Sequence, residues 1–235
     1  MHTDPFPFHT KIALPGAKSL TPVGKILCIG RNYAKHAEEM GSDVPDQPMV
    51  FLKPASAIVR SGDAVQLPSQ SHNVHHEVEL VAVIGRGGHN IDRKDALNHV
   101  AAYAVGLDMT ARDIQGEAKR NRHPWSVAKG FDTFAPLGPL TPADQVGNPQ
   151  QLEICVSVNG ETRQHGHTKY MIFSVAELVS YCSHIFTLSP GDLLYTGTPE
   201  GVSPVVEGDQ IRARLSNCAP LQVSVKQRGE RPALG

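Results

Sequence analysis

The stretch of sequence that decides the fold runs from residue 75 to residue 85 and reads HHEVELVAVIG. Because side chains on a β-strand point alternately to its two faces, Glu77 and Glu79 share one face, and His75 lies just before them on that face. Two like charges side by side on a partly buried strand repel each other and lose hydration. A bound divalent cation would offset that loss most directly, so the segment predicts a metal enzyme.

An alternative is a salt-bridged strand on a solvent-facing sheet, but the apolar run Leu80 to Ile84 favours burial. An HExxH zinc helix is excluded because Leu80 stands where the second histidine would be. Carboxylate-rich sites favour hard cations such as Mg²⁺ or Mn²⁺. A third ligand is then needed, and Asp108, an acid that follows an apolar segment, is the best candidate.

The composition is that of an ordinary globular chain. Of 235 residues, 40% are hydrophobic and 19% are charged, and 22 basic against 23 acidic residues leave a formal net charge of -1. This balance gives no long-range attraction to nucleic acid or to an anionic membrane, so neither is expected as a partner. The densest basic run, residues 119–122, is interpreted as a solvated helix end or loop.

The four cysteines, at positions 28, 155, 182 and 218, show no CxxC pairing and indicate a reducing compartment. The N-terminus has no signal pattern, and no apolar run reaches the length of a membrane span, so we expect a cytoplasmic protein. We expect residues 1–24, rich in proline and turn formers, to be an extension that packs on the main body. Residues 25–235 would then form the catalytic domain.

Hydrophobic periodicity predicts a mainly β fold with a few helices, of the α+β class. Strands are expected at residues 25–30, 49–53, 76–85, 152–158, 193–196, 211–215 and 221–225, with hairpins over 57–67 and around Asn159-Gly160. Helices are expected at residues 32–40 and 92–100, with a helical stripe over 171–186 and a loop over 141–150. The chain has no P-loop, no GxGxxG after a strand and no internal repeat.

Three further groups could carry chemistry. On a helical turn Asp108, Arg112 and Gln115 would lie near one face, and an acid beside a guanidinium and an amide suits an anionic, oxygen-rich substrate. A structural pair of Arg112 with Asp113 or a neighbour is an equal alternative. The loop Thr196 to Gly201 could hold a carboxylate through its hydroxyl and amide groups, or it is a plain turn.

His36 and Glu39 are three residues apart in an expected helix, so the carboxylate could orient the imidazole as a base. An ordinary surface pair is the stronger alternative for one such spacing. Lys129, among bulky apolar neighbours, could neutralise an oxyanion, although a surface lysine beside a hydrophobic patch is the more common outcome.

The order of these motifs closely resembles that of the fumarylacetoacetate hydrolase family over roughly residues 25–215. The matching blocks are GRNYAKHAEEMG (30–41), FLKP (51–54), HHEVELVAVIG (75–85), LDMTARDIQ (107–115), PWSVAKGFD (124–132), the Asn-Gly hairpin and GDLLYTGTPEGV (191–202). The small single-domain members, among them acylpyruvate and fumarylpyruvate hydrolases, are the most similar.

The resemblance implies a mixed β-sandwich or roll, usually in a homodimer, with one Mg²⁺ or Mn²⁺ per subunit. The positions that match the family's pattern are Glu77, Glu79 and Asp108 as metal ligands, His36 and Glu39 as a catalytic dyad on a short lid helix, Lys129 as the active-site lysine, and Arg112, Gln115 and Thr198 as substrate contacts.

The function that the resemblance implies is hydrolysis of the C–C bond of an acylpyruvate-type 2,4-dioxo acid to pyruvate and a carboxylic acid. Decarboxylation or tautomerisation of oxaloacetate by the same metal site is the alternative, and a metal-binding protein without turnover ranks last. A dicarboxylate substrate would need a cation at its distal end, for which Arg31, Arg120 and Arg122 are candidates.

Overall fold

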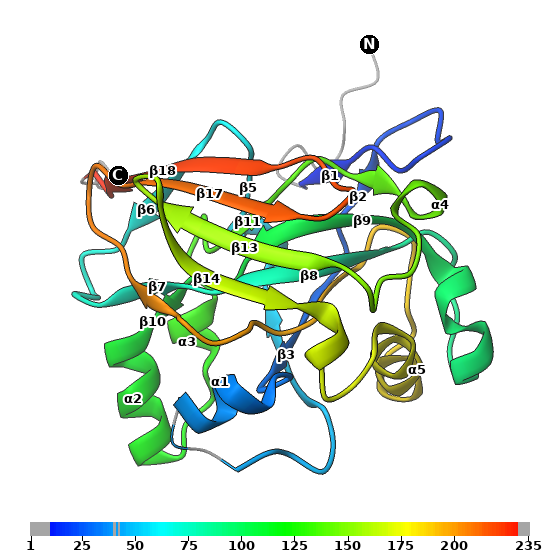
Figure 1. Ribbon diagram of the computed structural model, residues 1–235, viewed down its shortest axis with the longest axis horizontal. Coiled ribbons are helices and arrows are strands. Elements are labelled where there is room, and N and C mark those ends of the chain that lie inside the picture. The colour runs from blue at the N-terminus through cyan, green and yellow to red at the C-terminus, as the bar shows by residue number, and fades with distance from the viewer. Residues whose placement is uncertain (1–9, 40, 42, 230–235) are drawn as a thin grey trace, which may run out of the picture.

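The computed structural model describes residues 10–39, 41 and 43–229, and its described part is built around two packed β-sheets (Figure 1). The first nine residues of the expected N-terminal extension lie outside this range. The mainly β class with a few helices is confirmed, because strands form both layers and the helices are short.

The larger sheet has eight strands and holds the acidic stretch at its centre. Its order is β4 (Met49–Lys53), β3 (Ile26–Gly30), β15 (Leu193–Tyr195), β8 (Val78–Ile84), β9 (Val100–Leu107), β11 (Ala135–Leu137) and β5 (Ile58–Arg60), with β12 (Thr141–Pro142) paired to β9. Every residue of β8 is buried, because Leu80 and Ala82 face one hydrophobic cluster and Val81 and Val83 face another. The apolar run thus predicted its two-sided burial.

The second sheet has five strands and covers one face of the first (Figure 1). Its order is β14 (Glu161–His167), β13 (Glu153–Val158), β17 (Gln210–Leu215), β18 (Leu221–Gln227) and β6 (Ala64–Leu67). Alternate residues such as Ile154 and Val156 point inward and join the cluster that contains Leu80, whereas the other face carries polar side chains. This alternation is typical of a sheet with one solvated face.

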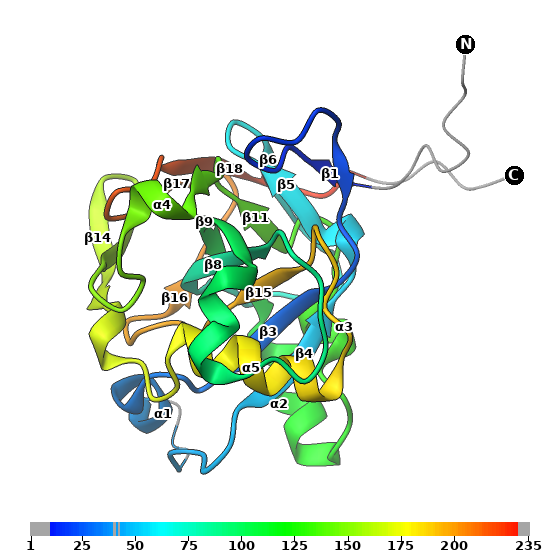
Figure 2. The same cartoon turned by 90° about the vertical axis from the view of Figure 1, so that its right-hand side faces the viewer.

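The remaining elements lie around these layers. Two small sheets contain β10 (Thr110–Ala111), β7 (Val74–His76) and β16 (Ser203–Pro204), and β1 (Lys11–Ile12) with β2 (Thr21–Pro22). The helices are α1 (Ala34–Glu39), α2 (Arg112–Asn121), α3 (Ser126–Lys129), α4 (Ala143–Val146) and α5 (Val175–Ile185), with 3₁₀ turns at Ala55–Ala57, Arg93–His99 and Thr168–Tyr170. Helices α1 and α2 lie at the same end of the large sheet in both views (Figures 1 and 2).

Several expected elements need correction. Residues 57–67 do not form a hairpin, because β5 pairs with β11 and β6 pairs with β18 in different sheets. The helical stripe begins only at Val175, where Ser174 forms a capping box with Glu177, and the expected loop 141–150 contains β12 and α4. The Asn159-Gly160 turn is confirmed, with positive φ at both residues.

All four cysteines are free, as their spacing predicts. No helix in the described residues has the length and apolar character needed to cross a membrane.

Candidate active site

The three predicted metal ligands lie together at one end of the β8–β9 pair. Glu79 is the second residue of β8, Glu77 lies directly before that strand, and Asp108 follows the last residue of β9. The antiparallel register pairs Val78 with Leu107, and the Asp108 amide donates to the Glu77 carbonyl at 2.8 Å. One carboxylate oxygen from each acid lies within 4.8 Å of the other two, and each residue is at most 5% exposed.

Three cations, Lys129, Arg112 and Lys53, form ion pairs with Glu77 or Asp108. The Lys129 ammonium lies 3.0 Å from Glu77 Oε2 and 2.6 Å from Asp108 Oδ2. The Arg112 guanidinium pairs with Glu77 Oε1. Burial alone would raise the pKa of Glu77, but Lys129 and Arg112 together hold it well below its ordinary value. Glu77 therefore stays ionised.

Glu79 has different electrostatic surroundings from Glu77. Its Oε2 accepts a hydrogen bond from the Gly197 amide at 2.7 Å, and it forms no ion pair with any residue that the structure describes. Burial raises its pKa well above the ordinary value, and the nearby Asp108 and Glu77 charges add to that rise. A buried carboxylate that faces two others and lacks a cationic partner is the donor set that a hard divalent ion satisfies. The cluster therefore fits a divalent cation.

Lys53 is a functional-site residue that the sequence analysis missed. Its buried ammonium lies 2.7 Å from Asp108 Oδ1 and donates to the carbonyls of Met109, Lys129 and Phe134 at 2.9, 2.7 and 2.7 Å. Burial lowers its pKa, although Asp108 opposes that change. The one signal in the sequence is a lysine at the end of an otherwise apolar strand, which does not by itself reveal three carbonyl partners from distant segments.

Lys129 is buried, which agrees with the interpretation of a desolvated lysine among apolar neighbours. It ends α3, and its ammonium lies 4.8 Å from the centre of the Phe51 ring. Burial opposes its charge, but Asp108 and Glu77 raise its pKa, so it remains a cation. The alternative of a surface lysine is wrong.

The His36–Glu39 pair also faces this site. Helix α1 buries His36, whose Nδ1 lies 3.2 Å from Glu39 Oε2, and the Gly201 amide donates to both Glu39 oxygens at 3.1 and 3.2 Å. His36 lines the same cavity as Glu77, Glu79 and Lys129. The alternative of an ordinary exposed pair is therefore wrong for His36, which is 5% exposed.

The loop from Thr196 to Gly201 holds carboxylates, as its composition suggested, but they are the protein's own. Gly197 binds Glu79 and Gly201 binds Glu39 through their amides. Both glycines have positive φ, and an added Cβ at Gly197 would lie 2.6 Å from the Asn32 Cβ. The loop thus links one metal-ligand candidate to the dyad.

Gln164, on β14, fixes this loop and was not singled out from the sequence. Its Nε2 donates to Thr198 Oγ1 and to the Pro199 carbonyl, each at 2.8 Å. Its Oε1 lies 2.9 Å from His76 Nδ1 and accepts from the Val78 amide at 3.0 Å. A buried amide that fills four hydrogen-bonding positions cannot be recognised from a strand pattern alone.

The expected helical turn over Asp108, Arg112 and Gln115 is wrong in part. Asp108 lies directly after the end of β9, and α2 begins only at Arg112. Arg112 Nη1 donates to Gln115 Oε1 at 2.8 Å, and its ion pair is with Glu77 rather than with Asp113. Its buried Nε has no hydrogen-bond partner among the described residues.

One residue of the basic run 119–122 lines the cavity. The run lies at the end of α2, and residues 120–122 are exposed, as the interpretation of a solvated helix end expects. Lys119 departs from it in part, because it is half-buried and lines the cavity together with Arg31 and Trp125. Arg120 and Arg122, two of the proposed distal cations, are exposed and do not line it.

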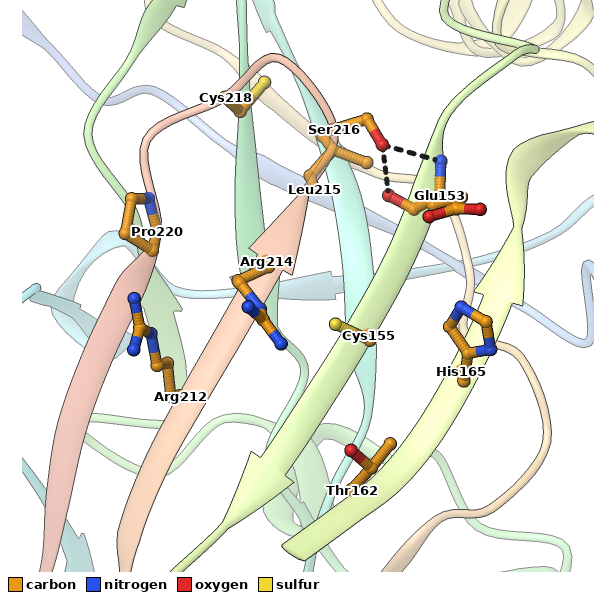
Figure 3. Close-up of a pocket in the computed structure, with 10 residues that line it drawn as sticks. All are labelled: Glu153, Cys155, Thr162, His165, Arg212, Arg214, Leu215, Ser216, Cys218 and Pro220. Atoms are coloured by element: carbon orange, nitrogen blue, oxygen red, sulfur yellow. Dashed lines mark hydrogen bonds between the residues drawn. The ribbon is translucent and has the colours of Figure 1, made fainter. Parts of the chain in front are cut away.

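A second hollow lies on the outer face of the five-stranded sheet. Figure 3 shows side chains from β13, β14 and β17 around it, including Cys155, His165, Arg212 and Arg214. No group of acids and histidines suited to a metal ion occurs there in the part of the chain that the structure describes.

The chain is similar to several known proteins. Residues 25–226 match the family described as "Fumarylacetoacetate (FAA) hydrolase C-terminal". The mitochondrial oxaloacetate tautomerase FAHD1 of Arabidopsis thaliana is 47% identical over 87% of this chain and 92% of its own. The mitochondrial oxaloacetate decarboxylase of Dictyostelium discoideum is 45% identical over 82% and 88%.

Among solved structures, the fumarylpyruvate hydrolase from Pseudomonas aeruginosa, in complex with Mn²⁺ and pyruvate, superposes with a TM-score of 0.87. It shares 45% sequence identity, and the match covers 94% of this chain and 97% of that one. With a family match over most of its length and relatives of this similarity, the chain belongs to the fumarylacetoacetate hydrolase family.

Proposed function

We propose that this protein is a divalent-metal-dependent hydrolase that cleaves the C–C bond of an acylpyruvate-type 2,4-dioxo acid. The observation that carries the proposal is the His36–Glu39 pair, which faces the same cavity as the acidic cluster. Hydrolysis needs an activated water, and an oriented imidazole beside a polarising site can supply one. The solved relative that contains Mn²⁺ and pyruvate supports both the metal and the product.

The carboxylate end of the substrate would be held by Arg112, Gln115 and Thr198. Arg112 Nε is buried without a partner among the described residues, and a substrate carboxylate would supply one. Gln115 accepts from Arg112, which fixes the orientation of its amide. Gln164 in turn holds the Thr198 hydroxyl.

Glu77, Glu79 and Asp108 would hold the cation, which when bound supplies positive charge that stabilises negative charge on the substrate. Glu39 would accept a hydrogen bond from the Nδ1–H group of His36, which leaves Nε2 free to act as the base. His36 would take a proton from water, whose oxygen then attacks the carbonyl carbon distal to the carboxylate. The bond from that carbon to the methylene breaks, and the electron pair passes into a pyruvate enolate.

Lys129 would stabilise the developing oxyanion, since its ammonium is desolvated and remains charged. The proton that His36 carries would return to the methylene carbon. The products are then pyruvate and a carboxylic acid, and one water is consumed.

Pyruvate release from acetylpyruvate and fumarylpyruvate, with Mg²⁺ or Mn²⁺ present, tests this proposal. His36→Ala should lower kcat by at least about a hundredfold, the lower end of the usual contribution of a general base. The same variant should bind Mn²⁺ as the unaltered protein does, because His36 is not among the three clustered acids. Unchanged pyruvate release in His36→Ala would eliminate the role of the dyad.

A second candidate is tautomerisation or decarboxylation of oxaloacetate, favoured by the names of relatives that are 45–47% identical. The same base could move a proton at the carbon beside the 2-oxo group without any attacking water. The ratio of kcat/KM for oxaloacetate and for fumarylpyruvate separates the two, because discrimination between substrates is set by that ratio.

A further inference from the structure

Gln164 joins two segments of the site through a buried side-chain amide whose orientation the backbone decides. Its Oε1 accepts a hydrogen bond from the Val78 amide at 3.0 Å, and its Nε2 donates to the Pro199 carbonyl at 2.8 Å. A backbone N–H can only donate and a carbonyl can only accept, so the oxygen must face Val78 and the nitrogen must face Pro199. The reverse orientation would place donor against donor at one end and acceptor against acceptor at the other, and it is excluded.

His76 holds the same amide from a third side. Its Nδ1 lies 2.9 Å from Gln164 Oε1, and its Nε2 lies 2.8 Å from Ser203 Oγ. Because Gln164 Oε1 can only accept, Nδ1 carries a proton and donates it to that contact. His76 is fully buried and Gln164 is 1% exposed, so bulk water does not compete for these hydrogen bonds. The imidazole is therefore a second donor that keeps Gln164 in one orientation.

The orientation of Gln164 determines how the Thr198 hydroxyl can act. Gln164 Nε2 donates to Thr198 Oγ1 at 2.8 Å, so the hydroxyl oxygen is an acceptor in that contact. A hydroxyl also has one proton to donate, and no residue in the described ranges accepts it from Thr198. Thr198 is buried and lines the cavity beside Glu77 and Glu79. The hydroxyl proton is therefore available to a ligand oxygen in that cavity.

We propose that Gln164 and His76 are positioning residues that make Thr198 a hydrogen-bond donor toward the substrate carboxylate. The inference rests on the proposed function, which places that carboxylate beside Arg112 and Thr198. A carboxylate oxygen accepts from the hydroxyl, and a hydrogen bond to a charged acceptor is stronger than one to a neutral group. Without Gln164, the hydroxyl loses the donor that fixes it, and ordering Thr198 then reduces the free energy of ligand binding.

A double-mutant cycle on ligand binding tests the proposal without turnover. The ligand is pyruvate, and its dissociation constant from the Mn²⁺-loaded protein is measured through the relaxation that Mn²⁺ imposes on its methyl protons. Thr198→Val should weaken pyruvate binding at least about tenfold and Gln164→Leu at least about fivefold, as expected for a hydrogen bond to a charged group that is lost or left unsupported. In the Thr198→Val background, Gln164→Leu should cause less than about a twofold further loss, because the hydroxyl that it positions is already absent.

Two controls separate positioning of the hydroxyl from general support of the loop. Gln164→Leu should keep the Mn²⁺ affinity within about threefold, because Gly197 still binds Glu79 and the two contacts are independent. Gln222→Leu makes the same change at an exposed position of the same sheet and should keep the pyruvate affinity. Equal losses of pyruvate affinity from Gln164→Leu with and without Thr198→Val, or a loss accompanied by equally weakened Mn²⁺ binding, would overturn the role of Gln164.

Variants of His76 test the orienting contact separately, and they also serve if Gln164→Leu does not fold. His76→Leu removes one donor to Gln164 Oε1 and should weaken pyruvate binding about threefold, less than Gln164→Leu does because the Val78 amide still holds that oxygen. His76→Asn should restore the affinity, since the side-chain nitrogen of asparagine can take the position of Nδ1 and donate in its place. Unchanged affinity in His76→Leu, or equal losses in both variants, would contradict the proposal for His76.

Turnover separates this inference from the proposed function. If 2,4-dioxo acids are hydrolysed, Gln164→Leu should raise KM more than it lowers kcat, because the substrate carboxylate takes no part in bond cleavage. If no 2,4-dioxo acid is hydrolysed but Gln164 and Thr198 are coupled in pyruvate binding, the proposed reaction fails and the positioning role stands. If hydrolysis occurs and the coupling is absent, the reaction stands and the positioning role fails.

Discussion

Replacing Lys53 with methionine should destabilise the protein far more than the loss of a typical lysine. The ammonium of Lys53 is buried, pairs with Asp108 at 2.7 Å and donates to three carbonyls. Methionine has a similar length and is apolar, so Lys53→Met leaves the Met109 and Lys129 carbonyls without that donor inside the core, whereas the Phe134 carbonyl still accepts from the Met109 amide at 3.1 Å.

The size of the effect follows from those contacts. Two unsatisfied carbonyls at about 1 kcal/mol each, with about 1 to 2 kcal/mol for the ion pair, give a loss of about 3 to 4 kcal/mol. The contribution of the ion pair is smaller than that of a typical buried pair, because Asp108 still pairs with Lys129 at 2.6 Å when Lys53 is lost. In a protein of this size the loss corresponds to a fall in Tm of about 10 °C.

Urea and thermal unfolding in EDTA would measure the loss without a contribution from bound metal. Lys35→Met is the matched control, because it removes an exposed ion pair with Glu200 at 3.5 Å and should change the free energy of unfolding by less than about 0.5 kcal/mol. A loss below about 1 kcal/mol in Lys53→Met would refute the reasoning that the buried ammonium holds these segments together.

Three further predictions concern the site and its surroundings. Glu79→Gln should weaken Mn²⁺ binding, measured by calorimetry, by more than about a hundredfold, because losing a residue that only supports a metal ligand already costs about tenfold to a hundredfold. It should not lower the Tm in EDTA, because it removes a buried acid that has no cationic partner among the described residues. Gln164→Leu should raise KM for 2,4-dioxo acids and lower the Tm, because Thr198 and Pro199 lose their donor; equal KM values would show that Thr198 needs no such support. His75→Asn should make the stability of the protein less sensitive to acid. Burial and the Arg112 charge lower the pKa of His75 from an ordinary value of 6.5 to about 4. As the pH falls from 6.5 toward 4, the unfolded chain therefore binds a proton at His75 that the folded protein does not, and the folded protein loses stability. The drop in unfolding free energy from pH 7 to pH 5 should shrink by about 1 kcal/mol, after allowance for solvent screening, and an unchanged drop in urea titrations would contradict this assignment.

The sequence predicted much of the architecture because its signals are local. The apolar run of β8 indicated burial on both faces, and its period of two put Glu77 and Glu79 on one face. The turn residues Asn159 and Gly160 predicted their hairpin for the same reason, since their backbone preferences act within a few residues. The pairing of residues 57–67 was wrong because sheet partners are chosen by distant strands, and here β5 and β6 join different sheets.

The residues of the site likewise fall into those that local sequence patterns predicted and those that only the folded structure brought together. Local spacing identified His36 with Glu39 and the pair of glutamates, and an acid after an apolar segment indicated Asp108. Only the tertiary structure decided that Lys53 would pair with Asp108, that Gln164 would bind the loop of Thr198, and that the half-buried Lys119 would line the cavity. A residue's neighbours along the chain set its backbone conformation and its face, but the charges and donors that it meets come from segments separated by tens of residues, and those contacts exist only once the two sheets have packed.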